Sequence, residues 1–149
     1  MVGEFERFSI IKPANEELED RVMTEIIRSS DCGNSPKNKF VEDLEVAFAQ
    51  RDTGFLLDSI ADDIRWNIVG ETPIRGKDAL KEAIESIPQD CEVTEITINH
   101  VVTHGKVGAV NGIIKRKNGR ACEFCSVYEF SSAKGTNVQD ITSYIISRV

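Results

Sequence analysis

The stretch ADDIRWNIVGETPIRGKDAL, residues 61–80, is the part of the sequence that decides the fold. Within it, Ile64, Trp66 and Ile68 occupy alternate positions, which is the period of a strand with one apolar face. Residues 70–73 then supply the glycine, threonine and proline of a turn. After the turn the apolar residues recur at helical spacing until a proline ends the pattern. The stretch therefore predicts a strand, a turn and the start of a helix.

Three further helices are predicted on the N-terminal side. The apolar residues within residues 37–50 fall on one side of a helix: Phe40, Val41, Leu44, Ala47 and Phe48. Residues 51–54 interrupt the pattern, and a short helix follows over residues 55–60. Nearer the N-terminus, Asn15 has the character of an N-cap and an apolar stripe follows it. We therefore expect a helix over about residues 16–29 that covers the domain or a partner subunit.

Four strands are predicted on the C-terminal side, over residues 92–103, 107–115, 121–131 and 138–147. The segment after the second of them contains Asn118-Gly119, a strong hairpin signal. Short connections between successive strands indicate an antiparallel meander. Helices first and strands afterwards favour an α+β fold over a parallel α/β fold.

The order of these elements, together with four short motifs, resembles the nuclear transport factor 2-like superfamily, and within it the SnoaL-like branch. The motifs are residues 47–52, residues 61–63, Trp66 and Ile74-Arg75-Gly76-Lys77. The resemblance covers residues 37–149, which we take as the domain, and leaves residues 1–36 as an N-terminal extension. It implies an α+β fold in which a cone-shaped, curved antiparallel sheet wraps around three helices, here with the extra N-terminal helix.

The resemblance also implies a homodimer, because the outer sheet face of such domains commonly pairs. Val101, Val110 and Ile114 are the residues that we expect on that outer face. The same family includes cyclases, isomerases and many proteins of no assigned activity, so the fold alone does not give a function.

Composition excludes several classes of protein. A chain of 149 residues is one domain of ordinary size, and 40% hydrophobic with 29% charged residues is typical of a globular protein. The net charge of −7 argues against a general nucleic-acid binder, which would need a basic patch. We find neither an apolar stretch of membrane-spanning length nor a secretory signal, and therefore expect no membrane partner and a cytoplasmic location.

The cysteines invite a metal or redox interpretation that their spacing does not favour. Cys122 and Cys125 form a C-x-x-C inside a predicted strand, where odd spacing directs the two side chains to opposite faces. No second pair of cysteines or histidines completes a tetrahedral site. We therefore expect no metal and no cofactor, and reduced thiols.

Ketosteroid isomerase, the best-defined enzyme of the superfamily, needs a carboxylate base, a tyrosine and a protonated aspartate. When residues 61–63 and 128–130 are matched to the corresponding motifs of that enzyme, the position of its carboxylate base falls on Ile68, or on Asn67 if the register slips. The position of its tyrosine falls on Leu44, and that of its protonated aspartate falls on Ser126. None of the three required groups is present, so that mechanism is not expected here. The remaining catalytic candidates are His100, Asp63 and Asp140, each of which has an ordinary structural explanation as well.

The resemblance further implies an interior pocket with an apolar wall, a few hydroxyl groups and an indole N–H. The residues expected to line it are Leu44, Phe48, Trp66, Ile68, Asn111, Phe124, Ser126, Tyr128, Ile141, Ser143 and Ile145. Pockets for small apolar molecules have this composition, and so do well-packed cores.

Three functions remain open from the sequence. The first is binding of a small, largely apolar molecule without catalysis. The second is a SnoaL-like isomerase, cyclase or hydrolase that uses a pocket histidine or aspartate. The third is a non-catalytic dimeric interaction domain. A lone ionisable group buried beside Trp66 and Tyr128 would favour the second, and a cavity filled by side chains would favour the third.

Overall fold

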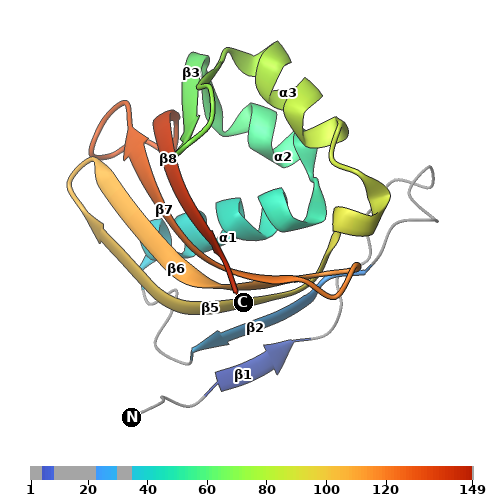
Figure 1. Ribbon diagram of the computed structural model, residues 1–149. Helices are drawn as coiled ribbons and strands as arrows, with labels where there is room; N and C mark the ends of the chain where they lie inside the picture. The colour runs from blue at the N-terminus through green and yellow to red at the C-terminus, as the bar shows by residue number, and fades with distance from the viewer. Residues whose placement is uncertain (1–4, 9–22, 30–34, 149) are drawn as a thin grey trace.

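The computed structural model describes residues 5–8, 23–29 and 35–148 (Figure 1). The helices are α1 (Pro36–Gln50), α2 (Thr53–Asp58) and α3 (Lys77–Glu85), and a 3-10 turn follows them as η2 (Gln89–Cys91). The strands are β1 (Phe5–Phe8), β2 (Glu25–Ser29), β3 (Ile60–Ile68), β4 (Ile74–Arg75), β5 (Val93–His104), β6 (Val107–Arg116), β7 (Ala121–Phe130) and β8 (Val138–Ser147). In these ranges no helix is both long and apolar enough to cross a membrane.

All the described strands form one curved, open sheet in the order β1-β2-β5-β6-β7-β8-β3-β4. The predicted antiparallel meander is confirmed for β5 to β8. The sheet as a whole is mixed rather than antiparallel, because β3 pairs in parallel with β8 and β2 pairs in parallel with β5. Parallel neighbours need long connections, and here the whole meander separates β3 from β8.

The helix boundaries follow from local capping. The Ser35 side chain accepts a hydrogen bond of 3.1 Å from the Asn38 backbone N–H and so begins α1. Arg51, in a left-handed conformation with φ of 57°, ends it. One residue later the Asp52 side chain accepts from the Phe55 N–H at 3.1 Å and begins α2. These contacts confirm the two predicted helices and the break between them.

The three helices lie on the concave side of the sheet, and the core fills the space between them (Figure 1). Helix α1 packs on β5 and β6, while α3 packs on β3 and β4. Side chains that are at most 2% exposed come from every one of these layers: Val41, Leu44, Leu56, Ile60, Ile64, Leu80, Ile84, Ile96, Ile98, Val110, Tyr128, Phe130, Val138 and Ile141. The α+β cone that the sequence predicts is therefore the observed fold.

The predicted N-terminal helix is wrong where the structure tests it. Residues 25–29 form the strand β2, and Ile26 aligns with Ile96 of β5. The remainder of the predicted helix, residues 16–22, lies outside the described residues. Two adjacent β-branched isoleucines, Ile26 and Ile27, suit a strand better than a helix, and the neighbouring strands β1 and β5 determine their conformation.

Strand β2 is also joined to α1 by an ion pair. Arg28 Nη1 donates to Glu42 Oε1, and the Glu42 side chain is completely buried while that of Arg28 is 22% exposed. Losing the arginine would leave a buried carboxylate uncompensated, which costs about 3–5 kcal/mol in comparable proteins. The division at residue 36 stays a prediction, but β1 and β2 are hydrogen-bonded into the same sheet as the domain.

Candidate functional site

A cavity of about 680 Å³ lies between α1, α3 and the concave face of the sheet. That volume is within the range of pockets for small molecules. Most of the wall is apolar: Phe48, Ala49, Trp66, Ile68, Val69, Ile74, Ala83, Ile84, Ile87, Val93, Ile96, Ile114, Phe124 and Ile145. The cone is therefore not filled by its own side chains.

Much of the predicted pocket lines this cavity. The residues that do so are Phe48, Trp66, Ile68, Phe124, Ser126, Ser143 and Ile145. Three other predicted residues, Leu44, Tyr128 and Ile141, are buried in the core behind the wall. That the lining residues bind a ligand stays a prediction. The Phe48 and Trp66 rings, whose centroids are 4.9 Å apart, form an aromatic part of the wall.

A chain of hydrogen bonds runs through one side of the cavity wall. The Trp66 indole N–H donates to Ser143 Oγ at 3.0 Å. The hydroxyl groups of Ser143 and Ser126 are 3.4 Å apart, and Ser126 in turn hydrogen-bonds the Glu45 carboxyl group. The Tyr128 hydroxyl donates to Glu45 Oε1 at 2.7 Å. Glu45 is thus held by two hydroxyl groups at the end of the chain.

Burial makes Glu45 the most unusual titratable group of the cavity wall. The residue is 6% exposed, and desolvation raises the pKa of its carboxyl group, although the hydrogen bonds from Ser126 and Tyr128 oppose that rise. Desolvation and the charge of Glu45 raise the pKa of the Tyr128 hydroxyl well above its usual value. Because its pKa is raised, the Glu45 carboxyl group holds its proton more tightly than an exposed carboxyl group does, which is one of the properties that general acids and bases share.

Glu45 is absent from the sequence-predicted site, although the sequence contains a signal for it. Position 45 is four residues after Val41 and three before Phe48, so it lies on the apolar stripe of the helix. A glutamate inside such a stripe lies either at the edge of the apolar face, beside water, or in the core, where its carboxyl group needs hydrogen-bond partners. Tyr128, which hydrogen-bonds it, lies 83 residues away in the sequence, so the pairing is visible only in the folded chain.

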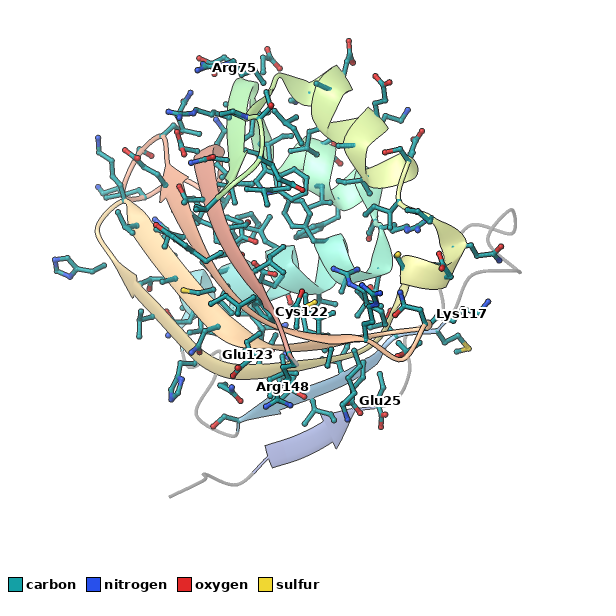
Figure 2. The ribbon with its side chains drawn as sticks, in the orientation of Figure 1. Glu25, Arg75, Lys117, Cys122, Glu123 and Arg148 are labelled. Atoms are coloured by element: carbon teal, nitrogen blue, oxygen red, sulfur yellow. The ribbon has the colours of Figure 1, made fainter. Side chains whose placement is uncertain are left out.

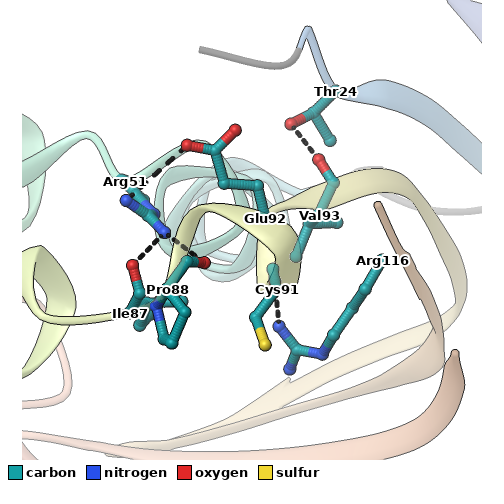
Figure 3. Close-up of polar contacts among 8 residues, drawn as sticks. All are labelled: Thr24, Arg51, Ile87, Pro88, Cys91, Glu92, Val93 and Arg116. Atoms are coloured by element: carbon teal, nitrogen blue, oxygen red, sulfur yellow. Dashed lines mark hydrogen bonds and ion pairs between the residues drawn. The ribbon is translucent and has the colours of Figure 1, made fainter. Parts of the chain in front are cut away.

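The cavity wall also carries two arginines, Arg51 and Arg116, which contact the segment around η2 (Figure 3). Arg51 Nη2 donates to the carbonyl oxygens of Ile87 at 2.6 Å and Pro88 at 3.2 Å, and its Nη1 is 3.7 Å from Glu92 Oε1. Arg116 Nη1 donates to the Cys91 carbonyl oxygen at 2.8 Å. Arg51 therefore fixes the segment after α3 to the end of α1, and Arg116 fixes η2 to the end of β6.

The predicted positions of His100 and Asn111 are wrong, because both lie on the outer face of the sheet. The Nδ1 atom of His100 is 3.0 Å from Asn111 Oδ1, and His100 is exposed. The cause is a bulge in β5: Ile98 aligns with Gly112 but His100 aligns with Asn111, so Asn99 is the extra residue of the bulge. The extra residue reverses the side-chain alternation, and His100 leaves the face of Ile98.

The same sheet geometry corrects the predicted outer face. Val110 and Ile114 of β6 are 1% and 9% exposed and point inward, opposite in phase to Asn111. Val101 packs against the core because it follows the bulge. Apolar residues occur on both faces of β6, so the alternation of side chains along the strand does not reveal which face is inside.

The two aspartate candidates lie outside the cavity wall. Asp63 is exposed and accepts a hydrogen bond of 2.9 Å from Gln139 Nε2. Asp140 alternates with the buried Ile141 along β8 and therefore faces away from the concave side. Of the ionisable candidates named from the sequence, none contributes to the cavity.

The cysteine pair is divided between the two faces of β7, as its spacing predicts. Cys122 is buried and lines the cavity, and Cys125 aligns with Tyr144 on the other face. Figure 2 shows Cys122 on the concave side of the sheet and its neighbour Glu123 turned away from it. The three cysteines of the described ranges are free thiols, and those ranges contain no group of three or more His, Cys, Asp or Glu side chains that could hold a metal ion.

The family model for the SnoaL-like domain matches residues 40–137. No curated protein matches the sequence. The fold, in contrast, has many solved relatives. An NTF2-like protein of unknown function from Burkholderia xenovorans superposes with a TM-score of 0.63 at 19% identity, covering 74% of this chain and 83% of that one.

Two structural neighbours have names that refer to reactions. A proposed SnoaL-like polyketide cyclase from Shewanella denitrificans has a TM-score of 0.65 at 11% identity and covers 75% of this chain and 91% of its own. An LEH-like epoxide hydrolase from M. tuberculosis has a TM-score of 0.59 at 16% identity, with coverages of 72% and 80%. At these identities the similarity establishes the fold alone.

Proposed function

Because the chain belongs to the SnoaL-like domain family, we propose that it binds a small, largely apolar molecule inside the cone. The observation that carries this proposal is the cavity of about 680 Å³ with its mainly apolar wall. Enclosed apolar surface with a few oriented polar groups is what binding sites for small molecules present. Trp66 and Phe48 supply the aromatic surface, and the two serines beside Glu45 supply the polar groups.

The test is ligand-induced thermal stabilisation across a panel of small apolar and carbonyl compounds, with Trp66 emission followed in parallel. A ligand at one hundred times its dissociation constant stabilises the folded state by about 2.7 kcal/mol. Trp66 is the only tryptophan and lines the cavity, so a true cavity ligand must also shift its emission. A panel in which no compound changes both signals would contradict the proposal.

A matched variant separates cavity binding from surface binding. Ala83 of α3 lines the cavity, and Ala83→Phe would occupy part of the space with its ring. We expect this variant to lose the ligand response while keeping the wild-type circular dichroism spectrum. Lys81→Phe, on the exposed face of the same helix, serves as the control and should respond as the wild type does.

A second candidate function is acid–base catalysis on the bound molecule, with Glu45 as the proton donor or acceptor. The buried Glu45 carboxyl group, its raised pKa and its hydrogen bond from Tyr128 favour this candidate. Perturbed titratable groups in a cavity are frequent at catalytic sites, although structural networks also produce them. The names of the cyclase and hydrolase neighbours agree with this possibility at the level of the fold.

The catalytic candidate is tested by turnover of any compound that binds. Glu45→Gln keeps the size of the side chain and an oxygen for the Tyr128 hydroxyl but cannot exchange a proton. If Glu45 is the acid or base, the variant should bind the compound and convert it about 100-fold or more slowly. Glu129→Gln, which changes an exposed carboxylate, is the control. Full turnover by Glu45→Gln would refute a catalytic role for Glu45.

A further inference from the structure

The charged side chains of the cavity wall differ in how many partners they have within the protein. Among the described lining residues, five carry a charge: Glu45, Arg51, Glu71, Glu92 and Arg116. Glu45 accepts hydrogen bonds from two hydroxyl groups, and Arg51 lies 3.7 Å from Glu92. Glu71 is exposed at the turn between β3 and β4. Arg116 is the lining cation that no described carboxylate approaches as an ion-pair partner.

The Arg116 guanidinium group is only partly used by the protein. A guanidinium group has about five N–H donors, and the hydrogen bond that Arg116 makes within the described residues runs from Nη1 to the Cys91 carbonyl oxygen at 2.8 Å. The residue is partly buried, and Figure 3 shows its guanidinium group beside Cys91. The bond to Cys91 holds the group in place, so its remaining donors are oriented in advance.

The neighbouring positions show that this orientation is specific to Arg116. Lys115 and Lys117 flank it, are exposed and do not line the cavity. Lys115 Nζ pairs instead with Glu95 Oε2 at 3.1 Å. Alternation along β6 continues from Ile114, which lines the cavity, to Arg116. The strand therefore directs one of three consecutive cations inward.

A partly desolvated guanidinium group, most of whose donors have no acceptor among the described residues, favours a singly charged oxyanion such as a carboxylate or a sulfonate. Arginine binds carboxylates through two parallel N–H···O hydrogen bonds, and such charge-assisted bonds are stronger than neutral ones. The Ser147 hydroxyl, on the strand residue aligned with Cys122, lines the same cavity and offers a further donor. The chain as a whole carries −7, so an anion would be attracted by the local group and not by the general charge.

We propose that the cavity is specific for amphipathic organic acids, whose carboxylate or sulfonate group binds Arg116 while the apolar body lies against Trp66 and Ile84. The inference rests on the proposed binding function and adds the chemical class of the ligand. Apart from the Nη1 group that donates to Cys91, the donors of the Arg116 guanidinium group find no acceptor among the described residues; a purely apolar molecule adds none, and an anionic group supplies one.

The test compares two fluorescent dyes with the same ring system. Anilinonaphthalene sulfonate carries the anionic group, and N-phenylnaphthylamine lacks it. We expect the wild-type protein to bind the sulfonate at least about tenfold more tightly, since hydrogen bonds to charged groups contribute about 1.5–3 kcal/mol. Arg116→Gln should remove that preference and leave the affinity for the neutral dye within about twofold.

Two further variants make the result specific. Lys117→Gln changes the net charge by the same amount at the next residue, outside the cavity, and should leave both affinities unchanged. Arg116→Lys keeps the charge but replaces the guanidinium group by an ammonium group, so it should weaken the preference for the sulfonate. If Arg116→Gln does not fold, Arg116→Lys and Lys117→Gln still decide the question, because a preference that falls in Arg116→Lys and not in Lys117→Gln depends on the guanidinium group and not on the overall charge. A preference that both variants keep in full would contradict the inference.

The outcomes distinguish the two proposals. If the neutral dye binds and the sulfonate shows no preference, or a preference that Arg116→Gln leaves intact, the organic-acid inference is wrong and the binding function stands. If neither dye binds the wild-type protein, the binding function itself is refuted, and the inference with it.

Discussion

The residue that gives the cavity its chemistry is Glu45, and its properties arise from two neighbours. The Tyr128 hydroxyl donates to it at 2.7 Å, and Ser126 hydrogen-bonds it from the adjacent strand position on the inner face. Burial raises the pKa of both Glu45 and Tyr128, so the tyrosine stays protonated and remains a donor. The pair keeps a carboxyl group with a raised pKa in a mainly apolar wall.

The raised pKa of Glu45 predicts how stability depends on pH. The folded state holds the Glu45 proton more tightly than the unfolded state does, so Glu45 lowers stability as pH rises from about 4.3, the pKa in an unfolded chain, through its raised folded pKa. The Glu45→Gln variant lacks this effect. Its melting temperature, measured relative to the wild type by thermal unfolding from pH 4 to 8, should therefore increase with pH. A difference that is constant with pH would contradict the raised pKa.

The sequence predicts the apolar part of the site better than the polar part. Trp66, Phe124 and Ile68 are placed correctly because the alternation of their strands is regular. Asn111 is placed on the wrong face, since both phases of β6 are apolar enough to be the inner one. Glu45 is missed because a glutamate within a helix is usually solvated and its partners come from distant strands.

At the scale of elements, the bulge between Ile98 and His100 divides β5 into two halves of opposite phase. Gly112 lies opposite the bulge, and a Cβ atom there would stand 1.8 Å from the Thr97 carbonyl oxygen. No side chain can occupy that space without movement of the β5 backbone. The bulge and the glycine therefore depend on each other, and together they turn His100 outward.

This dependence predicts that Gly112→Ala is severely destabilising. Overpacking against backbone typically costs about 1–3 kcal/mol, and a contact this short should reach the upper end of that range. The matched control is Gly54→Ala in α2, where the nearest atom to the new Cβ is Asp52 Oδ1 at an ordinary 3.7 Å. That control should be neutral or stabilising, because alanine is the better helix former. Chemical denaturation of both variants measures the two free energies of unfolding; equal values would contradict the prediction.

The elements that the sequence predicts correctly are those with local signals. Helix α1 has its cap at Ser35 and Pro36, and the β6–β7 hairpin has Asn118-Gly119. The strand β2 is mispredicted because its conformation depends on β5, about seventy residues away, with which its hydrogen bonds are made. The bulge at Asn99 is equally non-local, since nothing in the residues of β5 alone requires an extra residue at that point of the strand.

For the whole molecule, the outer face of the sheet carries several exposed apolar side chains. Val102, Tyr144 and Ile146 are 62%, 46% and 68% exposed on strands of the meander. Val102 aligns through Ala109 with Val127, and Tyr144 aligns with Cys125, so apolar residues adjoin on neighbouring strands of this face. Extended apolar patches of this kind often mark interaction sites. The homodimer that we expect from the resemblance would use this face, and it remains a proposal.

The dimer prediction is tested by mass in solution. Light scattering after size-exclusion chromatography should give twice the 16.6 kDa of one chain. Ile146→Glu places a charge on the outer face and should weaken the association at least about tenfold. Val69→Glu, at an equally apolar but separate exposed position after β3, is the control and should leave the mass unchanged. A wild-type protein that is monomeric at high concentration would refute the proposal.

The place of β8 between β7 and β3 has a consequence for the chain as it is made. Strand β3 is complete at residue 68, yet its partner β8 is not synthesised until residue 147. At about 5–20 residues per second, a ribosome needs on the order of ten seconds to cover that interval. Throughout it, the nascent chain presents an unpaired strand edge, the feature through which unfinished proteins aggregate. The step most vulnerable to misassembly, and most in need of a chaperone, thus comes before the cone can close.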